Sequence, residues 1–172
     1  MKTSEAIRAR RSIRKYVPGG EVTQEQIDAM LEAAMMAPSA CNTRPWEFIV
    51  VRKREVLDRI TELHPYTKML KTASVAIIIC ALPEVQADIS EGYFPQDCGA
   101  ATQNILLEAV EQGLGACWCG VYPREPRMAE MRQILGESGI EKLTPFCVIA
   151  IGVPDENPHP RGFFEAGKVR YI

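Results

Sequence analysis

The stretch Val75-Ala76-Ile77-Ile78-Ile79-Cys80-Ala81-Leu82 is apolar at every position. Side chains of a β-strand point alternately to its two faces, so a strand without polar positions needs an apolar layer on each side. The run is also much shorter than the roughly 20 residues of a membrane-spanning helix. It therefore predicts the central strand of a sheet that is covered on both faces.

Three further segments are typical of strands, and helical patterns separate them. The strand-like segments are residues 46–51, 116–122 and 145–152. The helical patterns are a short one around residues 56–60, a long one from about 96 to 112 that ends at Gly113, and one between Pro126 and Gly136. About four strands alternating with helices predict a single domain in which helices cover a sheet.

The first long helix has the clearest start signal. Thr23 and Gln26 form a capping-box pattern, in which each side chain bonds the backbone N–H of the other residue. Ile27 and Met30 begin an apolar repeat at helical spacing, and Pro38 ends it. The segment predicts an amphipathic helix that packs on the sheet.

Composition limits the class of protein. The chain has 172 residues, of which 47% are hydrophobic and 24% charged, with a formal net charge of -2. These values fit one globular domain, residues 1–172, with a substantial core. The start, MKTSEAIRAR, has no apolar signal-peptide region, so we expect a cytoplasmic protein without a membrane partner.

The six cysteines and two histidines predict neither a disulfide framework nor a metal site. Cys80 and Cys147 lie in apolar runs, where a free cysteine acts as a small hydrophobic residue. The chain has no C-x-x-C pattern, and His64 and His159 are far apart, which disfavours a metal site. Each histidine stands beside a proline, and we expect both at the surface.

Cys117 and Cys119 lie close together in a predicted strand. We expect their side chains on opposite faces of that strand, an arrangement that disfavours a disulfide between them.

Residues 153–172 differ from the rest of the chain. They contain Pro154, Pro158 and Pro160 and show no periodicity. The segment nevertheless carries Phe163, Phe164 and Tyr171, which are rare in disordered tails. We expect this tail to lie extended on a surface.

A cluster of cations, IRARRSIRKY (residues 7–16), stands out in an acidic chain. A nucleic-acid site needs a broad basic face, and a membrane-surface helix needs a wide apolar one; the stretch offers neither. Two interpretations stay open. The stretch is either a solvated helix end or a pocket for one phosphate, which arginine forks would bind bidentately with help from Ser12.

A polar loop, PSACNTRPW (residues 38–46), follows the first long helix. It is either a simple connector, since Pro38, Asn42 and Pro45 favour turns, or a binding loop for the edge of a heteroaromatic ring. The residues by themselves do not decide between the two.

Three motifs together resemble the flavin-dependent nitroreductase family in its short-chain form. They are Arg10-Arg11-Ser12-Ile13-Arg14, the PSACNTRPW loop and GLGACWCGVYP (residues 113–123), supported by the terminal Lys168-Val169-Arg170. The resemblance covers essentially the whole chain. It implies a three-layer α+β fold, a mixed central sheet with helices on both faces, an interwoven homodimer and one FMN per interface site.

The resemblance also implies roles for individual residues. Arg10, Arg11, Ser12 and Arg14 would hold the phosphate, the ribityl chain and the flavin pyrimidine edge, and Lys168 and Arg170 would join from the tail. Pro38, Ser39, Ala40 and Asn42 of the partner subunit would line the isoalloxazine ring. Trp118, Cys119 and Gly120 would pass their backbone near flavin N5, with Lys68 on the ribityl side.

The chain departs from the family pattern at three positions within these motifs. Ala40 replaces a frequent serine, Arg44 a common glutamine, and Cys119 the acidic residue often found before the glycine. A backbone role at Cys119 survives the replacement, whereas a side-chain role does not.

The implied activity is an NAD(P)H-dependent FMN oxidoreductase that passes electrons to a nitroaromatic or a quinone. It needs no catalytic side chain, because the flavin carries the redox chemistry. Two alternatives remain: a flavin-binding protein for storage or sensing, and a nucleic-acid-binding regulator that uses IRARRSIRKY.

Overall fold

A computed structural model describes residues 1–136, 142–159 and 161–172 of the chain. Pro160, one of the predicted tail prolines, lies outside these ranges. The helices are α1 (Thr3–Ala9), α2 (Gln24–Met35), α3 (Arg54–Leu63), α4 (Phe94–Glu111) and α5 (Glu125–Gly136). The strands are β1 (Trp46–Val51), β2 (Val75–Ala81), β3 (Gly115–Gly120) and β4 (Thr144–Gly152). Short 3-10 turns are η1 (Ala40–Asn42), η2 (Lys68–Lys71), η3 (Pro83–Gln86) and η4 (Ala166–Lys168).

The sheet has the order β1-β2-β4-β3, so the apolar run predicted as a central strand is indeed internal. All of β2 is buried, and β2 pairs with β1 on one side and β4 on the other. Every neighbouring pair of these strands is antiparallel. The mixed character that the family resemblance implied is limited, within the described ranges, to one isolated parallel bridge between Ser12 and Ala116.

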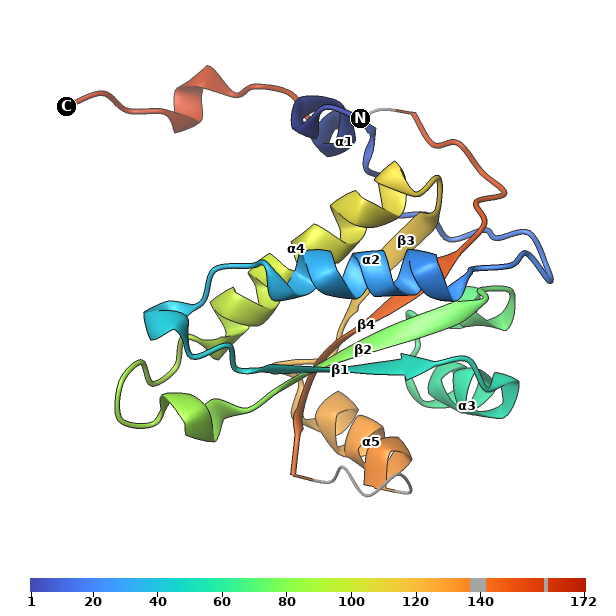
Figure 1. Cartoon of the computed structure of the whole chain (residues 1–172), viewed down its shortest axis with the longest axis horizontal. Coiled ribbons are helices and arrows are strands. Elements are labelled where there is room, and N and C mark those ends of the chain that lie inside the picture. The colour runs from blue at the N-terminus through green and yellow to red at the C-terminus, as the bar shows by residue number, and fades with distance from the viewer. Residues whose placement is uncertain (137–141, 160) are drawn as a thin grey trace.

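Two helical layers cover the sheet, and the expected three-layer α+β fold is confirmed (Figure 1). Ile77 and Ile79 of β2 point into a core formed with α2 and α4. Ala76 and Ile78, one position out of phase, point into a second core formed with α3 and α5. The alternation of side chains along one strand thus supplies both cores.

The structure contains the capping box predicted at the start of α2 and the glycine predicted at the end of α4. Thr23 Oγ1 accepts a hydrogen bond from the Gln26 backbone N–H at 3.2 Å, and Gln26 Oε1 accepts from the Thr23 N–H at 3.0 Å. Helix α4 begins at Phe94, slightly before the predicted start, because Pro95 is tolerated in a first turn. Gly113 ends that helix with a φ of 71°, a conformation that glycine adopts without steric cost.

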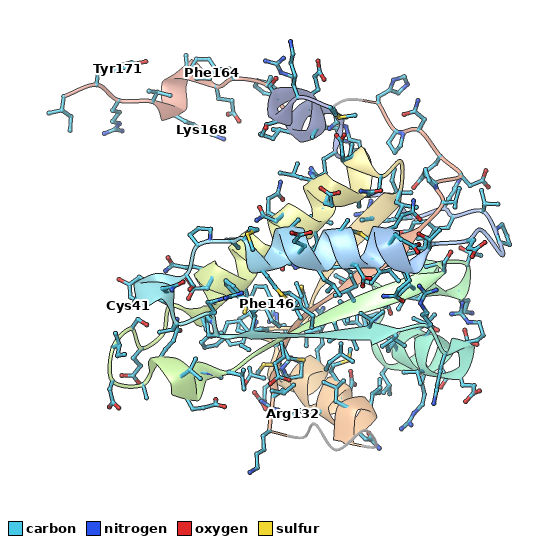
Figure 2. All side chains as sticks on the ribbon, viewed as in Figure 1. Cys41, Arg132, Phe146, Phe164, Lys168 and Tyr171 are labelled. Atoms are coloured by element: carbon cyan, nitrogen blue, oxygen red, sulfur yellow. The ribbon has the colours of Figure 1, made fainter. Side chains whose placement is uncertain are left out.

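The tail is extended, and this chain does not cover its aromatics: Phe163 is 83% exposed and Tyr171 92% exposed. Figure 1 shows the C-terminus projecting past α1, and Figure 2 shows Phe164, Lys168 and Tyr171 on this projecting segment. No apolar surface of the same chain meets these rings within the described residues.

Among the helices that the structure describes, none combines the length and the hydrophobicity that a membrane crossing requires.

Candidate cofactor site

The basic N-terminal stretch is fixed against the edge of the sheet by two buried residues. The Ile13 N–H donates to Ala116 O of β3 at 3.0 Å, and the Ile13 side chain is buried. The Tyr16 hydroxyl lies 2.7 Å from Ile13 O and 3.0 Å from Ala150 O of β4. Burial raises the pKa of Tyr16 well above its usual value, so the hydroxyl stays a donor. Residues 12–16 are therefore held by the sheet, whereas residues 7–9 form the exposed end of α1 and Arg10 caps that helix.

Two glycines make this close approach sterically feasible. A Cβ on Gly115 of β3 would lie 2.7 Å from Ile13 Cγ2, and one on Gly152 of β4 would lie 2.9 Å from Tyr16 Cδ1. Both distances are too short for non-bonded carbons. The absence of side chains at these positions lets Ile13 and Tyr16 pack directly on the strands.

Next to these anchors the stretch lines a pocket of about 310 Å³, the arginine pocket. Its lining residues are Arg10, Arg11, Ser12, Arg14, Glu156, Pro158 and Arg161. The one carboxylate in this lining, Glu156, is already occupied: its Oε1 accepts from the backbone N–H groups of Arg14 at 2.5 Å and Lys15 at 3.1 Å. Four arginines face one carboxylate in this lining, so the pocket is strongly positive.

A second pocket of about 390 Å³, the β3 pocket, shares Arg14 with the first. It is lined by Arg14, Pro65, Tyr66, Lys68, Met69, Cys117, Trp118, Cys119 and Gly120. The structure thus brings together eight of the predicted site residues, in two pockets that Arg14 joins: Arg10, Arg11, Ser12, Arg14, Lys68, Trp118, Cys119 and Gly120.

The end of β3 is open to a planar ligand. A Cβ on Gly120 would meet no atom within 4 Å, and the neighbouring Trp118 is 37% exposed. Backbone N–H groups at such a strand end are reachable by a flat ring. The residues present fit a flavin mononucleotide, with cations at one end and an accessible glycine backbone at the other.

The predicted orientation of Cys117 and Cys119 is wrong. Both side chains belong to the core on the α3 and α5 side of the sheet, because residues two apart on a strand share a face. The Cys119 thiol donates to Tyr66 O at 3.3 Å, and all six cysteines are free. As expected for small hydrophobic residues, Cys80 and Cys147 are fully buried, and burial raises the pKa of Cys80 to about 12.

The predicted surface position of His64 is also wrong, whereas His159 is exposed. His64 is only 2% exposed, and its ring bonds the backbone of Gly120 in the β3 pocket. No local pattern indicates this role, because the partner lies 56 residues away along the chain.

The PSACNTRPW loop contributes nothing to either pocket in this chain. Pro38, Ser39, Ala40 and Asn42 line neither of them. The loop is well held: Asp97 Oδ1 accepts from the Ala40 N–H at 3.1 Å, and Ser39 Oγ accepts from the Arg44 N–H at 2.9 Å. Asp97, a buried residue that sequence reasoning missed, fixes a loop that faces away from the pockets of its own chain.

Lys168 and Arg170 also lie outside both pockets. They belong to the projecting tail, where Lys168 Nζ pairs with Glu165 Oε1 at 2.8 Å (Figure 2). A single copy of the chain therefore assembles the arginine and β3 pockets and leaves the loop and tail residues apart from them.

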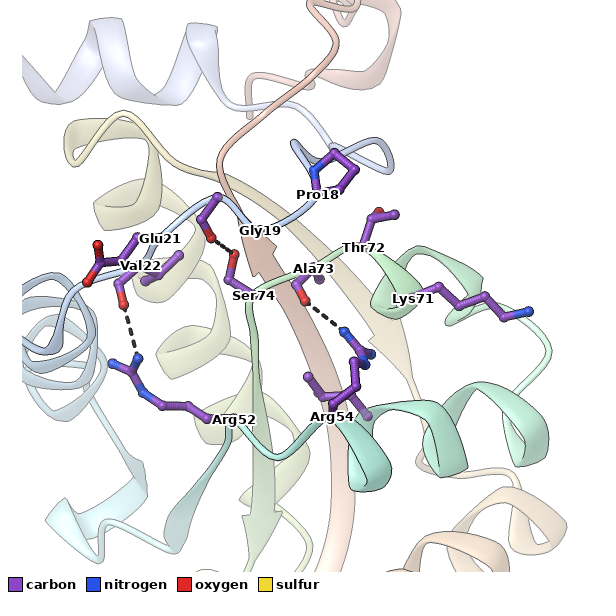
Figure 3. Close-up of a pocket in the computed structure, with 12 residues that line it drawn as sticks. Pro18, Gly19, Glu21, Val22, Arg52, Arg54, Lys71, Thr72, Ala73 and Ser74 are labelled. Carbon is purple, nitrogen blue, oxygen red and sulfur yellow. Dashed lines mark hydrogen bonds between the residues drawn. The ribbon is translucent and has the colours of Figure 1, made fainter.

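A third pocket, the largest of those described at about 580 Å³, is lined partly by Arg52, Arg54 and Lys71 (Figure 3). Its arginines bond the backbone: Arg52 Nη1 donates to Val22 O at 3.2 Å, and Arg54 donates to the carbonyls of Ala73 and Leu70. Figure 3 shows the Lys71 side chain pointing away from both arginines. The two arginines join segments of the fold, and the three cations do not converge on one point.

Comparison with known proteins agrees with this geometry. A model described as the nitroreductase family matches residues 7–65 and 63–153. A Methanothermobacter thermautotrophicus protein, provisionally named NADH dehydrogenase/NAD(P)H nitroreductase, is 49% identical over 98% of this chain and 86% of its own length.

Two solved structures extend the comparison. An FMN-dependent nitroreductase from Clostridium difficile is 33% identical, with a TM-score of 0.85 over 96% of each chain. A protein from Desulfovibrio desulfuricans, provisionally identified as a nitroreductase and solved with FMN, is 29% identical. Its TM-score is 0.84, and the match covers 100% of this chain and 97% of that one.

Proposed function

This chain belongs to the nitroreductase family, and from that premise we propose that it is an NAD(P)H-dependent FMN oxidoreductase. Its acceptor would be an electron-poor compound such as a nitroaromatic or a quinone. The observation that carries the proposal is Arg14, which joins a positive pocket to a pocket lined by the open end of β3. Bound FMN supplies the redox chemistry, by accepting hydride at N5 and passing electrons to the acceptor.

The arginine pocket would hold the FMN phosphate. A phosphate monoester carries roughly -1.5 to -2 charges near neutral pH. Arg10 and Arg14 can bind its oxygens with paired N–H groups, and Ser12 can donate one more hydrogen bond. Arg11 adds its charge and the N–H groups that its bonds to the Arg10 and His159 carbonyls leave over. Glu156 opposes the anion less than its charge suggests, because its Oε1 already accepts two backbone N–H groups.

The β3 pocket would hold the flavin ring. The backbone of Trp118, Cys119 and Gly120 would lie along the ring, with an amide N–H directed toward N5. Lys68 and Arg14 line the same pocket and place positive charge beside the ring. Fixed positive charge stabilises a ring that gains negative charge on reduction.

A second copy of the chain would complete the site, as an interwoven homodimer. Pro38, Ser39, Ala40 and Asn42 of the partner would cover the ring. Lys168 and Arg170 of the projecting tail would join the phosphate. The exposed Phe163, Phe164 and Tyr171 support this arrangement, because large exposed aromatics commonly mark an interaction surface.

An absorbance spectrum and a turnover assay test the proposal. The purified protein should be yellow, and NADH or NADPH should bleach it without oxygen. Addition of a nitroaromatic or a quinone should then restore the colour over many cycles.

Each contrary outcome points to a different protein class. Protein that stays colourless after addition of FMN contradicts the proposal. Flavin binding without turnover indicates a storage or sensing protein. Salt-sensitive retention on DNA without a chromophore indicates a nucleic-acid-binding regulator.

A further inference from the structure

His64 lies between α3 and η2, and its two ring nitrogens have different partners. Nε2 is 2.9 Å from the carbonyl oxygen of Gly120, which can only accept a hydrogen bond. The Tyr66 backbone N–H, which can only donate, points to Nδ1 at 3.2 Å. The two contacts are satisfied together only when Nε2 carries the hydrogen and Nδ1 carries none. They therefore assign a neutral ring with one defined tautomer.

These contacts connect the two walls of the β3 pocket. One wall is the segment of residues 65–69, and the other is residues 117–120 at the end of β3. The Cys119 thiol adds a second tie between them by donating to Tyr66 O at 3.3 Å. His64 is buried, so its bonds across the walls do not compete with water.

Arg127 of α5 acts on the same two groups from the solvent side. Its Nη1 donates to Gly120 O at 3.3 Å, and its guanidinium carbon lies 5.0 Å from the centre of the Tyr66 ring. The His64 ring is a second neighbour of the Tyr66 ring, at 6.2 Å between centroids and nearly perpendicular at 74°. Tyr66 and the Gly120 carbonyl are thus each in contact with the Arg127 cation and with the His64 ring.

We propose that His64 is a positioning residue for the cofactor: as the Nε2–H tautomer it fixes the Gly120 carbonyl and Tyr66, and so holds both walls of the pocket at the spacing that the flavin requires. The inference rests on the proposed function, because it needs the β3 pocket to bind the flavin ring. His64 does not line that pocket itself and acts through its neighbours. Gly120 needs such a restraint because a glycine backbone has the widest conformational freedom.

The first test reads the tautomer directly and needs no flavin. Long-range ¹H–¹⁵N NMR of protein labelled at histidine nitrogens distinguishes the two ring nitrogens. The chain has only two histidines, so a His159→Gln variant assigns the spectrum. We expect His64 to give the pattern of a pure Nε2–H tautomer, while exposed His159 gives an average of two. A Nδ1–H pattern or an averaged one for His64 overturns the inference.

The second test measures the dissociation constant and the reduction potential of FMN in three variants. His64→Leu removes both ring nitrogens, and we expect FMN to bind about tenfold more weakly because a buried hydrogen bond is lost. His64→Gln can place an amide N–H near the position of Nε2 and should recover most of this loss. His159→Gln should bind FMN as the wild type does.

The pattern across the variants separates positioning from a general effect on the fold. Thermal midpoints measured without FMN show how far each substitution destabilises the chain. Wild-type affinity and potential in both His64 variants contradict the inference, as does an equal loss in Leu and Gln that follows their thermal midpoints. A wild-type chain that binds no FMN contradicts the proposed function instead, while the NMR result still decides the tautomer.

Discussion

The arginine pocket and the pocket lined by Arg52 and Arg54 differ in how their guanidinium groups are used. Arg52 and Arg54 donate to backbone carbonyls across the fold (Figure 3). They also donate to the side chains of Gln24 and Asp58. In the arginine pocket, by contrast, the Arg10 side chain has no hydrogen bond or ion pair among the described residues. The Arg14 side chain makes one bond of 3.4 Å to Ser12 O. Arg11 is the exception in this pocket, because it donates to the carbonyls of Arg10 and His159.

The difference shows that the number of arginines does not identify an anion site. What matters is how many guanidinium N–H groups make no hydrogen bond within the chain and can therefore bind a ligand. Around Arg52 and Arg54 the donors hold the chain segments together, whereas around Arg10 and Arg14 most of them remain for a ligand. Substitutions in the two pockets should therefore separate stability from cofactor binding.

The largest expected effect comes from Gly115→Ala, which acts beneath the arginine pocket. The new Cβ would lie 2.7 Å from Ile13 Cγ2, so Ile13 and the stretch that carries Arg14 must move. We expect a loss of about 2 kcal/mol in unfolding free energy, typical of overpacking, and weaker FMN binding. Chemical denaturation and a flavin titration measure the two effects.

Gly99→Ala is the matched control for that variant. Its Cβ would lie 3.7 Å from the Trp118 ring, an ordinary contact, and Gly99 belongs to helix α4. Alanine in a helix interior is favoured over glycine by about 1 kcal/mol, so this chain should become slightly more stable. Equal destabilisation by both substitutions contradicts the assigned packing of Ile13.

The next effect comes from Arg54→Ala, which removes donors to the Leu70 and Ala73 carbonyls. We expect a loss of about 1–2 kcal/mol in stability, since charged donors to carbonyls are lost. The exposed ion pair with Asp58 adds little to this value. The thermal midpoint should fall by roughly 3–6 °C. FMN affinity should stay at the wild-type value, and a parallel loss of flavin would contradict the separation of the two pockets.

Arg10→Ala should show the reverse pattern, with a smaller change in free energy. Among the described residues the Arg10 side chain makes no hydrogen bond or ion pair that the substitution would remove, so the thermal midpoint should change little. FMN affinity should fall about tenfold, because a charge-assisted bond to the phosphate is removed. Arg8, on the exposed face of α1, provides the control: Arg8→Ala should change neither quantity. If both variants lose FMN equally, the cluster acts only through its total charge.

The smallest effect is expected in the tail. Lys168→Ala and Arg170→Ala each remove one exposed cation, and exposed charge pairs contribute at most about 1 kcal/mol. We expect FMN to bind a fewfold more weakly, with the difference decreasing as salt is added. Affinities at low and high ionic strength measure this. An unchanged affinity at low salt removes the tail from the proposed phosphate site.

Sequence reasoning predicted those parts of the fold that have a local signal. The uninterrupted apolar run from Val75 identified β2, and the Thr23–Gln26 capping box identified the start of α2. The family motifs placed Arg10, Arg14 and Gly120 in one candidate site, and the structure brings them together in adjoining pockets. Cys117 and Cys119 were predicted to lie on opposite faces of their strand, although the period of two along a strand places them on the same face.

The residues that the sequence could not place depend on distant partners. His64 was expected at the surface because Pro65 follows it and no ligand spacing surrounds it. Its ring nevertheless bonds Gly120 on another element. Asp97 gave no signal of its role in holding the loop at Ala40. The tail aromatics predicted that the tail lies on a surface. The described residues of a single chain do not provide that surface.

Local patterns in the sequence therefore predicted the order of the helices and strands from α2 onward, the two-sided burial of β2 and the residue types of the candidate cofactor site. Periodicity, capping patterns and residue chemistry act over a few neighbouring positions, and each can be read locally. The folded chain was needed to show which arginines remain free for an anion and which nitrogen of His64 carries the hydrogen. Both depend on hydrogen bonds between groups that are far apart in the sequence and that meet only when the sheet and its helices pack together.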